Sequence, residues 1–262
     1  MISDRWPELP VLGSADLPRL HDDALWPALL TLSERLPAEH VVIGGIMVYL
    51  HGAVAGRRPI RVTSDVDVLF NVEIQPSSLK EAVDVLAQLG YKVAPDSPIE
   101  STHRYLGPNG EQVDVLAPAG VKPPPNLETT PPGRTVPVYG GRQALLHRVV
   151  IKATHGGRTA DIVVPDLARA LAIKTAAYGD HARSRPAEAF NSRHLLDLAF
   201  LASVVEDPSD ILEALGPVPP EGHLDQAAVL DDPAHAAWSG AGEDAEDARL
   251  TWDVLRHGYG AE

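Results

Sequence analysis

Residues 63–70 read TSDVDVLF, an alternation of acidic and apolar side chains that decides how the surrounding chain folds. Successive side chains of a β-strand point to opposite faces, so the pattern predicts a strand with two unlike faces. The two valines and Phe70 would face the core, and Asp65 and Asp67 would share the other face. The stretch therefore predicts a half-buried strand that holds two carboxylates side by side.

A strand that ends in a pair of glycines precedes this stretch. The apolar run VVIGG at 41–45 predicts a buried strand entering a turn at Gly44 and Gly45, and IMVYLHGA at 46–53 predicts a short helix. Residues without a Cβ let backbone N–H groups approach a phosphate closely, and a helix start favours an anion. A glycine pair at a strand end is more often only a tight turn, so the motif indicates a phosphate site only together with other signals.

A hairpin supplies a third carboxylate downstream. HRYLG at 103–107, the turn residues 108–110 and EQVDVLAP at 111–118 predict two paired strands, with Asp114 in the second. If that strand lies beside the Asp pair, three carboxylates converge, as in sites of two-metal phosphoryl or nucleotidyl transfer. The alternative for the Asp pair alone is an amphipathic edge strand whose acids face water. The glycine turn, the Asp pair and the third Asp in this order are more specific than any one of them.

Apolar residues at helical spacing surround these strands. The predicted helices are 23–36, 78–89, 166–178, 187–204, 208–215 and 244–257, and the other elements are a Pro-rich loop at 119–133 and a second hairpin at 148–164. We therefore expect an α/β (α+β) fold, with a mixed-sheet core flanked by helices. Residues 1–164 would form this core with its N-terminal helix, and residues 165–262 would form a helical region with an acidic tail.

The formal net charge of −14 is unevenly distributed along the 262 residues. Residues 205–262 hold 14 Asp and Glu against two Arg, and we expect this tail to be a solubilising surface rather than a segment that binds a partner. Residues 134–193 hold ten Lys and Arg against four acids, which would give one face the positive potential that phosphate groups need. A solvated surface is an equal alternative for that stretch.

The residue inventory excludes several classes of function. The chain has no Cys, which rules out disulfides, thiolate metal sites and thiol nucleophiles and fits a reducing compartment. Its 11 His lack the close spacing of a zinc site, and neither a GxSxG nor a P-loop motif occurs. The longest uncharged stretch, 40–56, is too short to span a bilayer. We therefore expect a cytoplasmic protein that does not contact membranes.

The ordered motifs resemble those of a known superfamily. IGGIMVYLHG, RVTSDVDVLF and VDVL resemble the minimal core of polymerase-β-type nucleotidyltransferases. The stretch from 165 to 202, PDLARALAIKTAAYGDHARSRPAEAFNSRHLLDLAFLA, is similar to a segment of the AbiEii-type (MenT-like) nucleotidyltransferases, the toxin family of type IV toxin–antitoxin systems. In that family a Lys on one helix and an Asp on the next accompany the core, and here these are Lys174 and Asp197. The resemblance covers roughly residues 38–204.

The resemblance implies attack by an acceptor hydroxyl on the α-phosphate of a nucleoside triphosphate, with release of pyrophosphate. Asp65, Asp67 and Asp114 would bind Mg²⁺, or Mn²⁺ in its place, and Asp114 would also accept the proton of the acceptor. The residues expected to bind the nucleotide are Gly44, Gly45, Arg61, Ser64 and Lys174. Asp197 would complete the catalytic set by orienting Lys174 or a ribose hydroxyl. The active site would lie between the core and the helical region.

The positions of Lys174 and Asp197 are unusual on physical grounds as well. Lys174 continues the apolar stripe that Leu167 and Leu171 form on their predicted helix, so its ammonium must snorkel, pair or serve a ligand. Asp197 interrupts the apolar run LLDLAFLA, where a carboxylate is costly unless it is paired. A buried ion pair that only joins two helices is the alternative to a role in binding the triphosphate.

The resemblance implies that the acceptor is the 3′ end of tRNA, and that the protein is a growth-arresting toxin with a cognate antitoxin encoded nearby. The basic stretch 134–193 would then contact the tRNA backbone. A small-molecule acceptor, as in antibiotic-modifying nucleotidyltransferases, is the alternative, because the whole chain is acidic. A further alternative is an inactive regulatory protein on the same fold. Three carboxylates held close together repel one another, and an inactive protein would have no reason to keep them.

Overall fold

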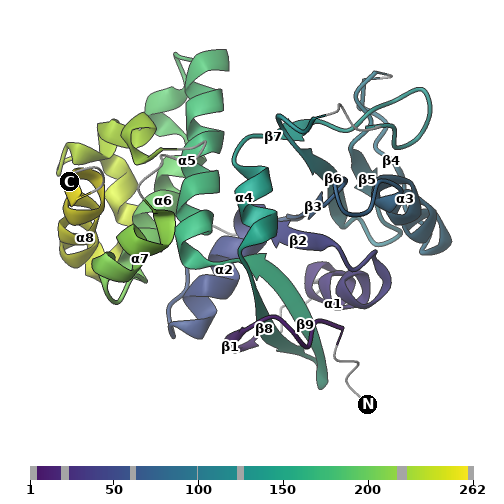
Figure 1. The fold of residues 1–262 in the computed structure, drawn as a ribbon, viewed down its shortest axis with the longest axis horizontal. Coiled ribbons are helices and arrows are strands. Elements are labelled where there is room, and N and C mark those ends of the chain that lie inside the picture. Colours follow the sequence, from purple (N-terminus) through teal and green to yellow (C-terminus); the bar gives the residue numbers. More distant parts are fainter. Residues whose placement is uncertain are drawn as a thin grey trace. The chain divides into compact units, whose positions relative to one another are not determined.

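The computed structural model describes residues 5–18, 24–59, 63–98, 100–122, 127–216 and 223–258. The chain forms two compact units, one from residues 1–46 and 63–165 and the other from residues 47–62 and 166–262. The first unit combines strands and helices, and the second is helical over its described residues (Figure 1). The predicted fold class, a mixed-sheet α/β core flanked by helices and followed by a helical region, is confirmed.

The first unit contains a mixed six-stranded sheet. The strand order is β2, β3, β6, β5, β4, with β7 paired to β6. The strands are β2 His40–Ile43, β3 Asp65–Phe70, β4 Lys92–Val93, β5 Arg104–Leu106, β6 Gln112–Pro118 and β7 Pro137–Val138. β3 and β6 are parallel, whereas β2 pairs with β3, and β5 with β6, in antiparallel register. The two strands that carry the predicted carboxylates are therefore neighbours in the interior of the sheet.

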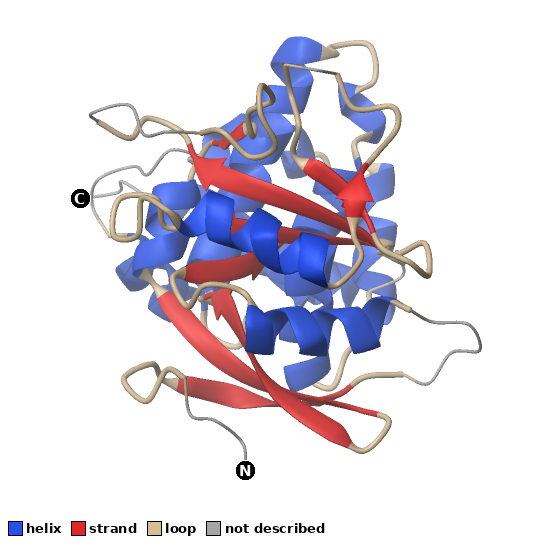
Figure 2. Cartoon of the chain, turned by 90° about the vertical axis from the view of Figure 1, so that its right-hand side faces the viewer, coloured by secondary structure: helices blue, strands red, loops and turns tan. Residues whose placement is uncertain are grey.

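A three-stranded sheet completes the strands of the first unit. Its order is β1 (Val11–Asp16), β8 (Arg148–His155) and β9 (Arg158–Pro165), and Figure 2 shows the long, twisted strands β8 and β9. The predicted hairpin at 148–164 corresponds to β8 and β9, which turn through two glycines with positive φ, Gly156 and Gly157. β1 has no counterpart among the predicted elements. Ala15 is its only buried side chain, so the strand lacks the apolar alternation that would reveal it.

Helices cover the strands of the first unit. They are α1 (Leu25–Arg35), which contacts β9, α3 (Ser78–Gln88), which contacts β6, and α4 (Gly141–Leu146), which contacts β2, β3, β6 and β9. α1 and α3 fall within the predicted helices, and α3 buries Leu79, Ala82 and Leu86 at helical spacing. A fourth helix, α2 (Gly44–Val54), begins in the first unit directly after β2 and continues in the second.

The second unit consists of helices that follow β9. They are α5 (Leu167–Ser184), η1 (Ala189–Asn191), α6 (Arg193–Ser203), α7 (Pro208–Leu215), η2 (Leu224–Asp231), η3 (Ala236–Asp244) and α8 (Ala245–Gly258). Asp166 caps α5 by accepting a hydrogen bond from the backbone N–H of Arg169. The predicted helix at 187–204 is divided, because Ser192 adopts an extended backbone and accepts from the N–H of His194. α6 therefore begins only at residue 193.

The acidic C-terminal segment is packed over its described residues. The sequence predicts helices there over 208–215 and 244–257, but η2 and η3 between them are 3₁₀-helices, and η3 and α8 pack on α6. Trp238 and Trp252 are buried there, so large apolar side chains contribute to the packing of this acidic segment. Of the helices described, none has the length and apolar character needed to cross a membrane.

Candidate metal and nucleotide site

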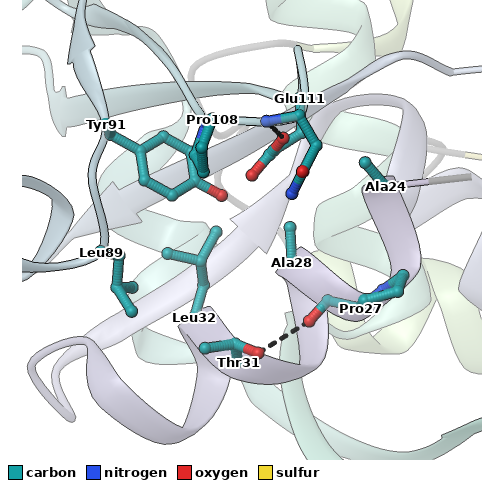
Figure 3. A pocket seen from close by; sticks show the side chains of 10 residues that line it. Ala24, Pro27, Ala28, Thr31, Leu32, Leu89, Tyr91, Pro108 and Glu111 are labelled. Atoms are coloured by element: carbon teal, nitrogen blue, oxygen red, sulfur yellow. Dashed lines mark hydrogen bonds between the residues drawn. The ribbon is translucent and has the colours of Figure 1, made fainter.

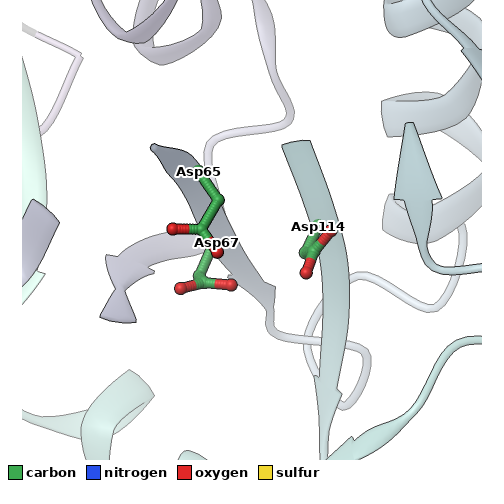
Figure 4. Close-up of side chains that lie close together, drawn as sticks. All are labelled: Asp65, Asp67 and Asp114. Atoms are coloured by element: carbon green, nitrogen blue, oxygen red, sulfur yellow. The ribbon is translucent and has the colours of Figure 1, made fainter. Parts of the chain in front are cut away.

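Three carboxylates meet on one face of the central strands. Asp65 and Asp67 lie on the same side of β3, and Asp67 is directly opposite Asp114 of the parallel strand β6. One oxygen from each carboxylate lies within 4.8 Å of the other two (Figure 4). Asp114 is buried, while the other two are partly exposed. The structure thus brings together the three carboxylates on which the predicted metal site depends.

The cluster has the chemistry of a divalent cation site. Three carboxylates at this separation repel one another, and most strongly where water is excluded. Carboxylate oxygens are the ligands that Mg²⁺ and Mn²⁺ prefer, at about 2.0–2.1 Å for Mg²⁺. The buried hydroxyl of Thr63 donates to Asp65 Oδ1 at 3.0 Å and orients that carboxylate. The residues present therefore fit Mg²⁺ or Mn²⁺.

Gly44 lies against the carboxylate of Asp67. It is the first residue of α2 and has a φ of +70°, which L side chains rarely adopt. A Cβ at this position would lie 1.7 Å from Asp67 Oδ2. Because Gly44 has no side chain, the first turn of α2 can lie against the carboxylate cluster. The N–H groups of this turn have no partner within the helix.

Replacing Gly44 by Ala is expected to lower the free energy of unfolding by about 1–3 kcal/mol and to weaken Mn²⁺ binding. The added Cβ imposes backbone strain and displaces the Asp67 carboxylate. Gly110→Ala is the matched control, since Gly110 has a φ of +86° but nothing within 4 Å of its Cβ position. Urea unfolding and a Mn²⁺ titration measure both effects. Equal losses of Mn²⁺ affinity in the two variants would contradict this assignment.

Arg104 is a charged member of the cluster that the sequence analysis missed. It lies opposite Asp114 on β5, and its Nε and Nη2 donate to Asp114 Oδ1 and Oδ2 at 3.0 and 2.9 Å. The hydrogen bond to Asp114 raises the pKa of Arg104, with smaller contributions from the charges of Asp65 and Asp67, while burial opposes the rise. The predicted hairpin could have revealed this contact, because its short turn at 107–110 fixes the register that pairs Arg104 with Asp114.

Lys174 and Asp197 form a buried ion pair within the second unit. The Lys174 Nζ donates to Asp197 Oδ2 at 2.6 Å between α5 and α6, and both side chains are at most 5% exposed. The ion pair that the sequence analysis gave as an alternative is therefore present. Burial, and next the charge of Lys174, lower the pKa of the neighbouring His194 to about 3, so this imidazole is neutral at physiological pH.

The other predicted nucleotide-binding residues differ in their surroundings. Gly45 is buried in the first turn of α2, and Ser64 is exposed immediately before β3. Arg61 lies outside the described residues. Thus the structure brings Gly44 to the carboxylate cluster. Gly45 follows Gly44 in the chain, Ser64 precedes Asp65, and Lys174 belongs to the second unit.

A separate pocket opens on the first unit. It measures about 820 Å³ and lies between α1 and the hairpin turn, with Tyr91 and Glu111 among its lining side chains (Figure 3). Burial, and next the charge of Glu111, raise the pKa of Tyr91. None of the predicted site residues lines this pocket, so it is not part of the carboxylate site.

Comparison with known proteins yields structures of low similarity. Neither a protein-family model nor a curated protein matches the chain. The solution structure of the antibiotic-resistance factor ANT(2'')-Ia is 13% identical with a TM-score of 0.35, over 89% of this chain and 91% of that one. The crystal structure of an antigenic nucleotidyltransferase-like protein from Paracoccidioides brasiliensis is 14% identical with a TM-score of 0.37, over 88% of each chain. At this degree of similarity, the chemistry of the site rests on this chain's own residues.

Proposed function

We propose that this protein is a metal-dependent nucleotidyltransferase. The observation that carries the proposal is the convergence of Asp65, Asp67 and Asp114 within 4.8 Å on two adjacent strands. The helix start at Gly44 borders the same carboxylates, which supports binding of a phosphate chain beside them. A bound Mg²⁺ or Mn²⁺ would supply charge neutralisation and Lewis acidity at the reacting phosphate. The family resemblance supports a nucleoside triphosphate as the substrate.

The reaction in this proposal is the one that the family resemblance implies. An acceptor hydroxyl oxygen forms a bond to the α-phosphorus, and the bond from that phosphorus to the bridging oxygen of the β-phosphate breaks, releasing pyrophosphate. Asp114 accepts the proton of the hydroxyl, since each carboxylate oxygen keeps a lone pair beyond the one used by Arg104. Asp65 and Asp67 hold the metal, and the backbone at Gly44 and Gly45 contacts the β- and γ-phosphates.

The remaining predicted residues have supporting roles in this proposal. Ser64 and Arg61 contribute to nucleotide binding beside the Asp pair. Lys174 neutralises charge on the triphosphate, and Asp197 orients its ammonium through their hydrogen bond. The buried ion pair is equally suited to stabilising the helices, so the two roles require separate measurements of stability and activity.

The acceptor is the least constrained part of the function. The family resemblance supports the 3′ end of tRNA, and with it a role as a toxin accompanied by an antitoxin. A specific observation favours a small-molecule acceptor instead. Eight of the ten basic side chains in 134–193 form ion pairs, namely Arg142, Arg148, Lys152, Arg158, Arg169, Lys174, Arg183 and Arg185. Pairing reduces the positive potential available to a nucleic-acid backbone, so a small hydroxylated acceptor is the second candidate.

Incubation with each α-³²P-labelled nucleoside triphosphate and Mg²⁺ tests the function. We expect label to enter total tRNA or, for the second candidate, a metabolite extract, with pyrophosphate released in equal amount. Excess EDTA should abolish the transfer, and added Mn²⁺ should restore it, because the carboxylates need a divalent cation. Absence of label in both acceptor pools, together with no nucleotide binding, would overturn the proposed function.

A further inference from the structure

The pocket between α1 and the hairpin turn is separate from the carboxylate cluster. Its volume of about 820 Å³ is in the range of small-molecule sites. Successive side chains of extended chain point to opposite faces, so Glu111, three residues before Asp114, leaves the hairpin on the other face from the cluster. The apolar residues that line the pocket are Ala24, Pro27, Ala28, Leu32, Leu89 and Pro108.

Glu111 places a buried carboxylate at the wall of this pocket (Figure 3). The residue is 7% exposed, and its Oε2 accepts a hydrogen bond from the backbone N–H of Asn109 at 3.0 Å. Within the described part of the chain, no Lys, Arg or His forms an ion pair with it. Burial of a carboxylate is costly unless a cation compensates its charge. Glu111 therefore carries a charge that no described side chain balances.

The fold does not require the charge of Glu111. A Gln at this position would accept the same hydrogen bond from Asn109 through its amide oxygen, without the cost of burying a charge. Gly107 makes room for the carboxylate, since a Cβ there would lie 2.3 Å from Glu111 Cδ. The hairpin turn thus holds the carboxylate in place at the pocket wall, and the charge is available to a ligand.

Tyr91 contributes a second polar group to the same wall. Burial, and next the charge of Glu111, raise the pKa of its hydroxyl, which therefore stays protonated at physiological pH. Its ring adds to the apolar lining of the pocket. A carboxylate forms its strongest hydrogen bonds with a charged donor such as an ammonium group. The lining therefore suits a ligand with one ammonium group on a compact apolar body.

We propose that this pocket binds a small organic amine, whose ammonium group pairs with Glu111 and whose apolar body packs against α1 and the hairpin turn. The ligand supplies the positive charge that the described chain lacks at this place. An ionised carboxylate has about four lone-pair sites, and the N–H of Asn109 uses one of them, so acceptor capacity remains for the ammonium. The site is independent of the proposed nucleotidyl transfer.

Titration with phenethylamine and with its neutral analogue phenethyl alcohol tests this site. By isothermal titration calorimetry, we expect the wild-type chain to bind the amine more tightly than the alcohol by on the order of tenfold. Methyl NMR shifts of Leu32 and Leu89 should report the bound amine. Glu111→Gln keeps the hydrogen bond from Asn109 but should bind both compounds equally. Asp84→Asn is the matched control, because it removes an exposed carboxylate on α3 and should match wild type.

Ala24→Phe provides a second test that leaves the carboxylate in place. The added ring occupies part of the pocket, so the variant should bind both compounds more weakly than wild type. This variant decides the question if urea unfolding reveals that Glu111→Gln is not folded. The proposal would be overturned if the wild-type chain bound neither compound, or bound both equally. An unchanged preference for the amine in folded Glu111→Gln, or unchanged amine affinity in Ala24→Phe, would overturn it as well.

Discussion

The double replacement Asp65→Asn, Asp67→Asn is expected to reduce nucleotidyl transfer by on the order of 10³-fold or more. The amide side chains keep the shape of the two carboxylates but remove two negative charges from a cluster whose oxygens lie within 4.8 Å of one another. A bound divalent cation would lose two of its three carboxylate ligands, and the reacting phosphate would lose the positive charge that the cation supplies. The expected defect is in chemistry and metal binding rather than in folding.

The fold should tolerate this double replacement. Removing like charges relieves repulsion, and the amide oxygen at position 65 can still accept from Thr63, so the double variant should remain folded. Asp84→Asn is the matched control, because Asp84 is an exposed carboxylate on α3 outside the cluster. Rates of label transfer and urea unfolding curves for the three proteins provide the comparison. A double variant that retains transfer within tenfold of wild type would show that the two carboxylates do not hold the catalytic metal.

Replacing Asp197 by Leu is expected to lower the free energy of unfolding by about 3–5 kcal/mol. The change leaves the ammonium of Lys174 buried, with its 2.6 Å partner removed, and both side chains are almost inaccessible to water. The double variant Lys174→Met, Asp197→Leu removes both charges and should recover most of the loss, because apolar side chains can fill the same space. Urea unfolding of the single and double variants measures the difference.

The same variants separate the two roles of Lys174. If the lysine neutralises triphosphate charge, the double variant should be stable yet transfer label far more slowly than wild type. Glu34→Gln serves as a control, since the Glu34–Arg158 pair is exposed and should be worth less than about 1 kcal/mol. A stable double variant with wild-type transfer would assign the pair to stability alone. A single Asp197→Leu variant as stable as wild type would contradict the buried-pair account.

The carboxylate cluster could be predicted because its geometry follows from local rules. Alternation along 65–67 puts two carboxylates on one face, and a hairpin signal puts Asp114 on a strand of its own. The burial of Lys174 likewise follows from helical spacing. Each of these placements requires only the period of one element, whereas the meeting of Asp67 and Asp114 also requires the parallel pairing of β3 with β6.

Features that depend on long-range pairing could not be predicted in this way. The contact of Arg104 with Asp114 depends on the register between β5 and β6, and β1 is visible only through its pairing with β8. The sequence of 134–193 predicts a positively charged surface. In the structure, however, Arg142 and Arg148 form ion pairs with Glu73 and Glu39, which are distant in the chain. The C-terminal segment is acidic on average, yet its two tryptophans, Trp238 and Trp252, are buried.

The most direct measurement of the central claim is a crystal structure with Mn²⁺ and an α,β-imido nucleoside triphosphate, using anomalous scattering to locate the metal. We predict anomalous density at about 2.1 Å from oxygens of Asp65 and Asp67, with Asp114 a ligand of the same or a second ion. The phosphate chain should lie beside the backbone of Gly44. Mn²⁺ and nucleotide bound together at another place in the chain, with the three carboxylates unligated, would contradict the account.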